Sequence, residues 1–217
     1  MLLEDERREV AAHAARLRAD GLVVGTAGNL SARVGDLVAA TPSGLAYEAL
    51  TPELVCVHRT DGSVVEAEMP VTVELSMHLA AYEATGAAAV VHTHATAATA
   101  VGLLVDELPA VHYLIEMFGG PVRVAPYVPP GTPELAEAMT DGIAGRSAVL
   151  LGSHGTIVVG DSVAEAYERT LLLEWLCDLY LRATSAGSPR LLTAEQLGAV
   201  SGSLDAYARS AAQLARR

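Results

Sequence analysis

Apolar residues recur along this chain with a helical period in some segments and as short runs or alternations in others. Residues 4–20 place Val10 and Leu17 on one face of a helix, which Asp20-Gly21 is expected to end. Short apolar runs bounded by glycine or proline predict strands. Further helices are expected over 72–85, 95–104, 134–143 and 163–184, and strands over 54–58, 63–67, 88–93, 122–127, 148–151, 156–159 and within 21–44.

Helix boundaries in this pattern have recognisable capping residues. Thr72 is expected to cap the helix that ends near Thr85, with Gly86 as its C-cap. Ser162 and Thr193 are the expected N-caps of the last two helical segments. Strands and helices are interspersed without an internal repeat or a linker, which predicts a single α/β domain over residues 1–217 with helices on the faces of a sheet.

The composition argues against several classes of protein function. The chain has 217 residues and a formal net charge of −12, so nucleic acid and anionic membranes are unlikely partners by charge alone. It contains no lysine, which excludes Schiff-base catalysis through lysine and a Walker-type phosphate loop. Cys56 and Cys177 lie in apolar runs and are expected to be buried and unpaired. The charged N-terminus and the lack of a long apolar stretch favour a cytoplasmic protein.

Three histidines form a candidate metal site. His92 and His94 stand two apart at the end of a predicted strand, so both imidazoles point to the same face. For this pair alone, two interpretations are about equally good: a metal site, or one buried histidine with an incidental neighbour. His154, in the turn Gly152-Ser153-His154-Gly155 between apolar strands, changes that balance. Three imidazoles with an open fourth position are what a catalytic zinc ion needs.

Glu74 lies near the start of the helix that follows Pro70, where the helix N-terminus stabilises a carboxylate. An ordinary first-turn glutamate fits this position equally well. Glu74 and His78 are one turn apart, so they form either a metal-binding pair or a surface contact. His13 and His58, like His78, have simple interpretations as helix or strand residues. From the residues alone, Glu74 is one candidate among many.

Several short motifs occur in an order that is specific to one family. The motifs are Gly28-Asn29-Leu30-Ser31-Ala32-Arg33, Thr41-Pro42-Ser43-Gly44, Glu74 with His78 and Tyr82, Val90-Val91-His92-Thr93-His94, Pro109-Ala110-Val111-His112-Tyr113, Gly131-Thr132 and His154-Gly155. With them the chain resembles the class II aldolase/adducin head family over essentially its whole length, and within it the branch that cleaves L-fuculose 1-phosphate. The resemblance implies a central, mainly antiparallel β-sheet flanked by helices on both faces.

The resemblance also implies roles for individual residues. One zinc ion per subunit is expected, with Mn²⁺ or Co²⁺ as alternatives, and Glu74 is the expected acid/base. Tyr113 is expected to act in a neighbouring subunit's site by protonating the aldehyde oxygen. Tyr207 is expected to cover the site from a C-terminal tail over about 190–217. The expected zinc ligands are His92, His94 and His154, and the expected substrate-binding residues are Gly28, Asn29, Ser43, Gly44 and Thr72, together with Tyr207.

The implied activity is that of a zinc-dependent aldolase and homotetramer with interfacial sites. It would reversibly cleave a small phosphorylated sugar, a ketose 1-phosphate, into dihydroxyacetone phosphate and an aldehyde through a metal-bound enediolate. Alternatives are an epimerase, dehydratase or decarboxylase of the same fold, although the segment 109–113 favours the aldolase. A non-catalytic adducin-like assembly domain is expected to have lost the metal ligands, which are present here.

The chain departs from the family pattern at two places that touch the substrate. The family aldolase has paired serines before the catalytic glutamate, whereas this chain has Val71-Thr72-Val73 and a single hydroxyl. A substrate-facing aromatic near Gly131 is replaced by Pro129-Pro130. The first departure bears on how phosphate is held, and the second on which aldehyde is accepted.

Overall fold

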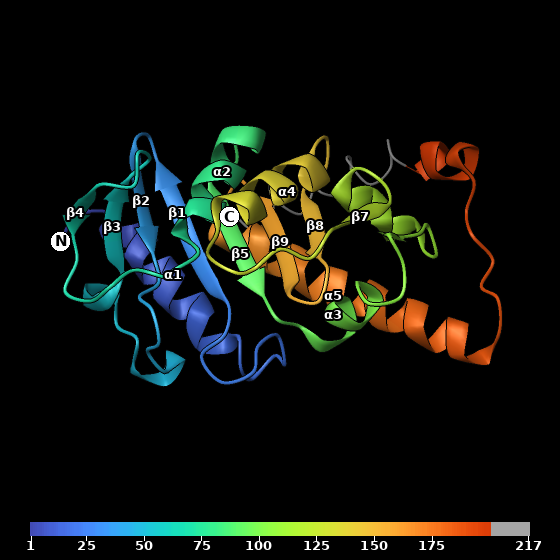
Figure 1. Ribbon diagram of the computed structural model, residues 1–217, viewed down its shortest axis with the longest axis horizontal. Coiled ribbons are helices and arrows are strands. Elements are labelled where there is room, and N and C mark those ends of the chain that lie inside the picture. Colours follow the sequence, from blue (N-terminus) through green and yellow to red (C-terminus); the bar gives the residue numbers. More distant parts are fainter. Residues whose placement is uncertain (201–217) are drawn as a thin grey trace, which may run out of the picture.

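The computed structural model describes residues 1–200 and contains a nine-stranded sheet within that range (Figure 1). The strands are β1 Asn29–Val34, β2 Leu37–Ala40, β3 Cys56–Arg59, β4 Val64–Glu66, β5 Ala89–Thr93, β6 Glu107–Leu108, β7 Val122–Ala125, β8 Ala148–Leu151 and β9 Gly155–Gly160. The α-helices are α1 Glu4–Arg16, α2 Leu75–Thr85, α3 Thr96–Val101, α4 Pro133–Ile143 and α5 Val163–Ala186, with a further helical segment over 194–200. Short 3₁₀ helices cover Tyr47–Ala49, Pro52–Leu54 and Tyr113–Phe118.

The strand order is β4-β3-β2-β1-β5-β9-β8-β7-β6. Every neighbouring pair is antiparallel except β7 with β8, which are parallel. The prediction of a mainly antiparallel sheet is therefore confirmed. The order also places β5 and β9 side by side at the centre, although they are about sixty residues apart in the chain.

Helices cover both faces of the sheet, as predicted, and the side-chain alternation of β5 shows how. Ala89 and Val91 point into a core formed with α1, α3 and α5, whereas Val90 points into a second core formed with α2 and α4. Because successive strand residues face opposite sides, both sides of a central strand must be apolar when both are covered by helices. In Figure 1, α2 and α4 lie above the sheet and α5 runs below it.

Some helix boundaries differ from the sequence-based expectation. Helix α1 ends at Arg16, before the predicted stop at Asp20-Gly21. Thr72 is not the N-cap of α2, which begins at Leu75 with Glu74 in the capping position. The Thr72 hydroxyl instead accepts the backbone N–H of Glu74 at 3.2 Å, so it fixes the turn before the helix. Gly86 is the C-cap of α2 with φ of 73°, as predicted.

Other boundaries agree with the predictions or were missed. Ser162 caps α5 through its hydroxyl, as predicted, and Thr132 caps α4 in the same way. The hydroxyl of Thr193 accepts the N–H of Gln196, as a cap should. The strand β6 and the 3₁₀ helix at Tyr113–Phe118 were not predicted, because two-residue strands and single tight turns leave little periodic signal.

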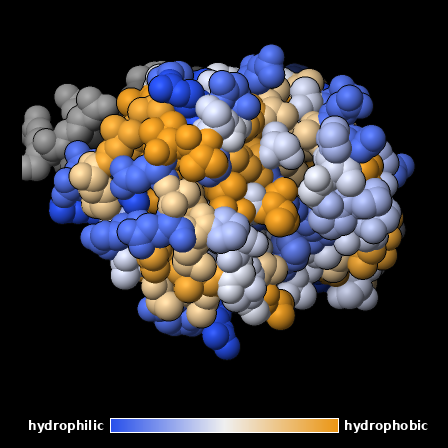
Figure 2. All heavy atoms as spheres, turned by 60° about the vertical axis from the view of Figure 1, so that its left-hand side comes forward, coloured by the Kyte–Doolittle hydropathy of each residue, from blue (hydrophilic) through white to orange (hydrophobic). Residues whose placement is uncertain are grey.

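The cysteines agree with the expectation from the sequence, and the surface mixes hydrophobic and polar residues. Cys56 and Cys177 are buried and unpaired. Figure 2, which brings the β4 side forward, shows hydrophobic residues at the surface between polar ones. No helix within residues 1–200 is long and apolar enough to cross a membrane.

Candidate metal centre and the cavity around it

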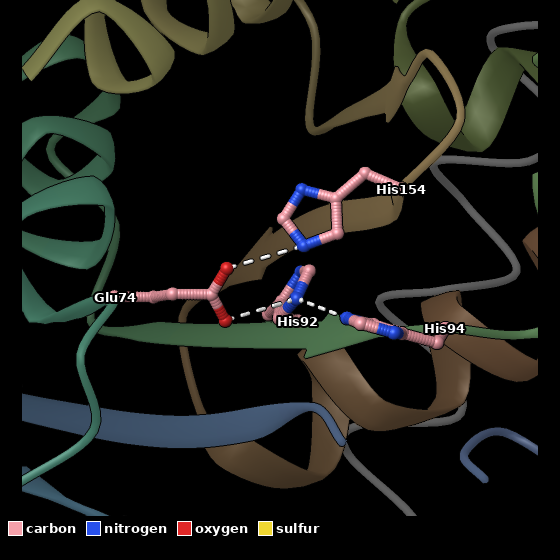
Figure 3. A group of neighbouring side chains, drawn as sticks. All are labelled: Glu74, His92, His94 and His154. Carbon is pink, nitrogen blue, oxygen red and sulfur yellow. Dashed lines mark hydrogen bonds and ion pairs between the residues drawn. The ribbon is translucent and has the colours of Figure 1, made fainter. Parts of the chain in front are cut away.

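Four side chains from three separate parts of the chain point toward one another (Figure 3). Glu74 is the residue before α2, His92 lies in β5, His94 directly follows β5, and His154 lies in the turn between β8 and β9. One donor atom of each side chain lies within 4.8 Å of the donor atoms of the other three. All but His94 are buried. The three histidines expected from the sequence are therefore brought together with Glu74.

The central strands set this arrangement. In the register of β5 with β9, His92 lies opposite Ile157 and Thr93 opposite Thr156, so the end of β5 faces the start of β9. The turn just before β9 carries His154 and is tight, since Ser153 adopts a left-handed conformation with φ of 55°. A Cβ on Gly155 would stand 2.0 Å from the carbonyl oxygen of Thr93. A glycine at 155 is thus required for His154 to approach β5.

The close approach at Gly155 leads to a prediction about stability. Replacing Gly155 with alanine should lower the free energy of unfolding by about 1–3 kcal/mol or more, because the new methyl group meets fixed backbone. It should also weaken metal binding, since β5 and the His154 turn would be pushed apart. Thermal and chemical denaturation with metal titration would measure both effects.

A matched control is Gly198→Ala, in the exposed helical segment 194–200, where an added Cβ meets nothing within 4 Å. That change should be neutral or stabilise by up to about 1 kcal/mol. Equal stability of the two variants would contradict the packing argument.

The geometry of the three imidazoles fits a metal ion. Their ring centroids form a triangle with sides of 4.9 Å. Nε2 of His92 lies 3.0 Å from Nε2 of His94, which places two potential lone pairs face to face. Nδ1 of His92 is 2.8 Å from the carbonyl oxygen of Thr156, so the ring proton is on Nδ1 and Nε2 is available as a ligand. Nitrogen ligands of this kind with one carboxylate suit zinc and related divalent ions.

Glu74 is held in its charged form. Burial alone raises the pKa of its carboxyl, but the close imidazoles of His154 and His92 and the hydrogen bond from Asn29 outweigh burial and hold the pKa well below its usual range. Its two oxygens lie 3.2 Å from Nε2 of His92 and 3.2 Å from Nε2 of His154. Burial, together with the nearby His92 and His154, lowers the pKa of His94 to about 4. A neutral imidazole and an anionic carboxylate are the forms that bind a metal ion.

A cavity of about 490 Å³ opens beside this cluster. Its wall includes Glu74, His94 and His154, so the cluster is accessible to a small molecule. The same wall carries five of the six residues expected to bind substrate, namely Gly28, Asn29, Ser43, Gly44 and Thr72. These residues come from the loop before β1 and the first residue of β1, from the loop after β2 and from the turn before α2. Their distances along the sequence do not show that they lie together.

Three further residues with polar side chains line the cavity, and the sequence analysis did not select them: Thr26, Tyr127 and Ser153. Ser153 had a usable signal, because it precedes His154 in a glycine-marked turn. Thr26 also had one, as it lies two residues before Gly28. Tyr127 had none, since its position at the cavity depends on how the loop after β7 folds back over the sheet.

Not every expected residue lies at this cavity. Tyr113 does not line it, and its side chain is 43 % exposed in the 3₁₀ helix that follows His112. Tyr207 lies outside the described residues. His78 is neither a surface contact nor one of the clustered donors, because it is a fully buried residue of α2 and is bonded to Ser31 and Asn29. Burial lowers the pKa of His78 to about 3.

Comparisons with known proteins identify the family of the chain. The family model described as Class II Aldolase and Adducin N-terminal domain matches residues 8–181. A 5-deoxy-D-ribulose 1-phosphate aldolase of Bacillus thuringiensis serovar kurstaki is 39 % identical over 210 residues, which is 95 % of this chain and 99 % of that protein. The L-fuculose phosphate aldolase of Escherichia coli K12 is 37 % identical over 183 residues, covering 83 % and 85 %.

The fold comparison gives the same answer. A solved L-fuculose 1-phosphate aldolase superimposes with a TM-score of 0.91 at 33 % identity, over 94 % of this chain and 98 % of that one. With the metal-binding cluster present, the family match and these relatives place the chain among the carbon–carbon lyases, and it belongs to the Class II Aldolase and Adducin N-terminal domain family.

Proposed function

We propose that the chain is a zinc-dependent aldolase that reversibly cleaves a ketose 1-phosphate into dihydroxyacetone phosphate and an aldehyde. The observation that carries this proposal is the pairing of two features in one cavity. A buried, ionised carboxylate stands among three imidazoles on one wall, and short neutral polar groups line the other. The first suits proton transfer beside a metal ion, and the second suits a phosphate.

The phosphate side of the cavity relies on small groups. The Thr72 hydroxyl already accepts an N–H from Glu74, so its own proton is available to a phosphate oxygen. Ser43 and Gly44 lie in a turn where Gly44 has φ of 71°, a conformation that suits glycine. No arginine lines the cavity within residues 1–200. Thr72 and this turn therefore take the place of charged phosphate ligands.

Each protein group has a separate role in the proposed reaction. A divalent ion bound by His92, His94 and His154 would supply Lewis-acid polarisation of the donor's ketone and hydroxyl oxygens. Glu74 removes the proton from carbon 3 of dihydroxyacetone phosphate in the condensation direction and returns it during cleavage. In cleavage the bond between carbons 3 and 4 breaks, the hydroxyl on carbon 4 loses its proton, and carbon 4 becomes the aldehyde. Tyr113 of a neighbouring subunit is the proposed partner for that oxygen.

Two candidate substrates would both release dihydroxyacetone phosphate, which is the donor in the reverse reaction. Cleavage of 5-deoxy-D-ribulose 1-phosphate between carbons 3 and 4 gives dihydroxyacetone phosphate and acetaldehyde, whereas L-fuculose 1-phosphate gives the same donor and lactaldehyde. The two relatives quoted above are named for these substrates. Tyr127 and Pro130 line the cavity close to the position where the family aromatic is missing, so we assign them to the aldehyde end.

A condensation screen tests the proposed reaction. The zinc-loaded enzyme is given dihydroxyacetone phosphate or free dihydroxyacetone with acetaldehyde, lactaldehyde or glycolaldehyde, and products are identified by NMR. We expect condensation with the phosphorylated donor and short aldehydes, and little with free dihydroxyacetone. Interconversion of ketose phosphates without release of dihydroxyacetone phosphate would instead indicate an epimerase.

We also predict a homotetramer whose sites are shared between subunits. Tyr113 is partly exposed and away from its own chain's cavity, which fits a role in a neighbour. Mass photometry should show four subunits, and Tyr113→Phe should lower turnover. Co-expression of Glu74→Gln and Tyr113→Phe subunits should recover activity that neither has alone, because some sites then combine an intact Glu74 with an intact Tyr113. An active monomer, or the absence of recovery, would contradict shared sites.

A further inference from the structure

A continuous hydrogen-bonded chain leads from helix α2 to Glu74 through the interior. The Tyr82 hydroxyl lies 2.7 Å from Ser31 Oγ, and Ser31 Oγ lies 2.6 Å from Nδ1 of His78. Nε2 of His78 lies 2.5 Å from Oδ1 of Asn29, and Nδ2 of Asn29 lies 2.8 Å from Oε2 of Glu74. All five side chains are buried, and only Asn29 and Glu74 reach the cavity.

The two ends of the Asn29 amide fix the direction of every bond in this chain. Its nitrogen faces Oε2 of Glu74 and only donates, and its oxygen faces Nε2 of His78 and only accepts. His78 then carries its proton on Nε2 and accepts at Nδ1 from the Ser31 hydroxyl. Ser31 in turn accepts from the Tyr82 hydroxyl. A neutral histidine fits the middle of this chain because it offers one donor and one acceptor on opposite edges.

We propose that His78 is a positioning residue of the active site, which locks the Asn29 amide so that its N–H holds Oε2 of Glu74. This inference rests on the proposed aldolase function. When the three imidazoles bind a metal ion through Nε2, they cannot donate to the carboxylate. Asn29 then supplies the hydrogen bond that orients Glu74, and Oε1 is the oxygen that exchanges the proton with the donor.

The structure argues against other roles for His78. Both ring nitrogens are occupied by protein partners, and the side chain does not line the cavity. It therefore does not reach the donor as a base. It is also outside the group of four metal-binding candidates. Its position on α2, four residues after Glu74, instead ties the start of that helix to β1 through Asn29 and Ser31.

Two substitutions at His78 and one elsewhere test the proposal. His78→Leu removes both hydrogen bonds at similar size, and His78→Gln keeps an amide N–H that can reach Asn29. His58→Leu makes the same chemical change at another buried histidine, whose side chain is bonded within residues 1–200 to the Gly62 carbonyl and lies outside the cavity. For each variant we measure exchange of the carbon 3 proton of dihydroxyacetone phosphate in D₂O, cleavage turnover, donor KM, zinc content and melting temperature.

We expect His78→Leu to lose about 10–100-fold in proton exchange and in kcat, with donor KM and zinc content little changed. His78→Gln should recover most of this loss, and His58→Leu should exchange like the wild type even if it melts earlier. Exchange in His78→Leu equal to that in His58→Leu would overturn the proposal, and so would a His78→Gln variant as impaired as the leucine variant.

A measurement on the unaltered protein covers the case in which His78→Leu does not fold. Long-range ¹H–¹⁵N correlation on the histidine-labelled, zinc-loaded enzyme should show His78 as the Nε2–H tautomer. An Nδ1–H tautomer would reverse the bond directions and overturn the proposal. A wild-type enzyme that neither exchanges nor cleaves would contradict the proposed function itself, whereas an active wild type with unimpaired His78→Leu contradicts only this inference.

Discussion

Replacing Glu74 with glutamine should reduce exchange of the carbon 3 proton of dihydroxyacetone phosphate by about 10²–10⁴-fold, the usual loss when a general base is removed. The amide preserves size and hydrogen bonding but cannot take a proton. Zinc should remain bound, because the three imidazoles are untouched. The loss should appear in turnover more than in donor KM, since the proton moves only in the transition state. Proton exchange without any aldehyde isolates this step from carbon–carbon bond formation.

A suitable control is Glu174→Gln. The Glu174 carboxylate accepts the backbone N–H groups of Ala97 and Ala98 at 2.8 Å each, so it stabilises the start of α3 and does not line the active-site cavity. Its replacement should lower the melting temperature and leave exchange intact. Glu74 makes no capping bond to its own helix, which separates it from such a structural role. Near-normal exchange in Glu74→Gln would show that the base lies elsewhere.

Removing the metal ion should abolish both cleavage and proton exchange. A strong chelator is expected to strip about one ion per subunit, and Zn²⁺ should restore activity, with Mn²⁺ and Co²⁺ as partial substitutes. His92→Ala should weaken zinc binding by more than about 100-fold, because a direct ligand matters at least as much as the groups that orient it. Elemental analysis and activity on the same samples measure both quantities.

His13→Ala provides the matched histidine control, since His13 lies on α1 and outside the four-residue cluster. It should keep full zinc content and full activity. Full metal content and activity in His92→Ala would contradict the assignment of the cluster. Activity that survives complete metal removal would contradict the metal-dependent mechanism as a whole.

Much of the local structure was predictable from the sequence, because it depends on neighbouring residues. The spacing of His92 and His94 on a strand put both imidazoles on one face, and the structure brings their Nε2 atoms to 3.0 Å. Gly86 and Ser162 cap helices where their conformational and hydrogen-bonding preferences predict. The family motifs selected Glu74 as the acid/base, because local physical arguments did not distinguish it from other glutamates.

The rest depends on which segments lie side by side, and tertiary structure alone decides that. Strand order places β9 against β5, so His154 meets a pair sixty residues earlier in the chain. Helix α2 packs over β1 and buries His78 against Asn29 and Ser31, which sequence spacing had presented as a metal pair or a surface contact. Periodicity indicates which face of an element is buried, but not what it is buried against, and the partner determines whether a histidine binds a metal or positions a neighbour.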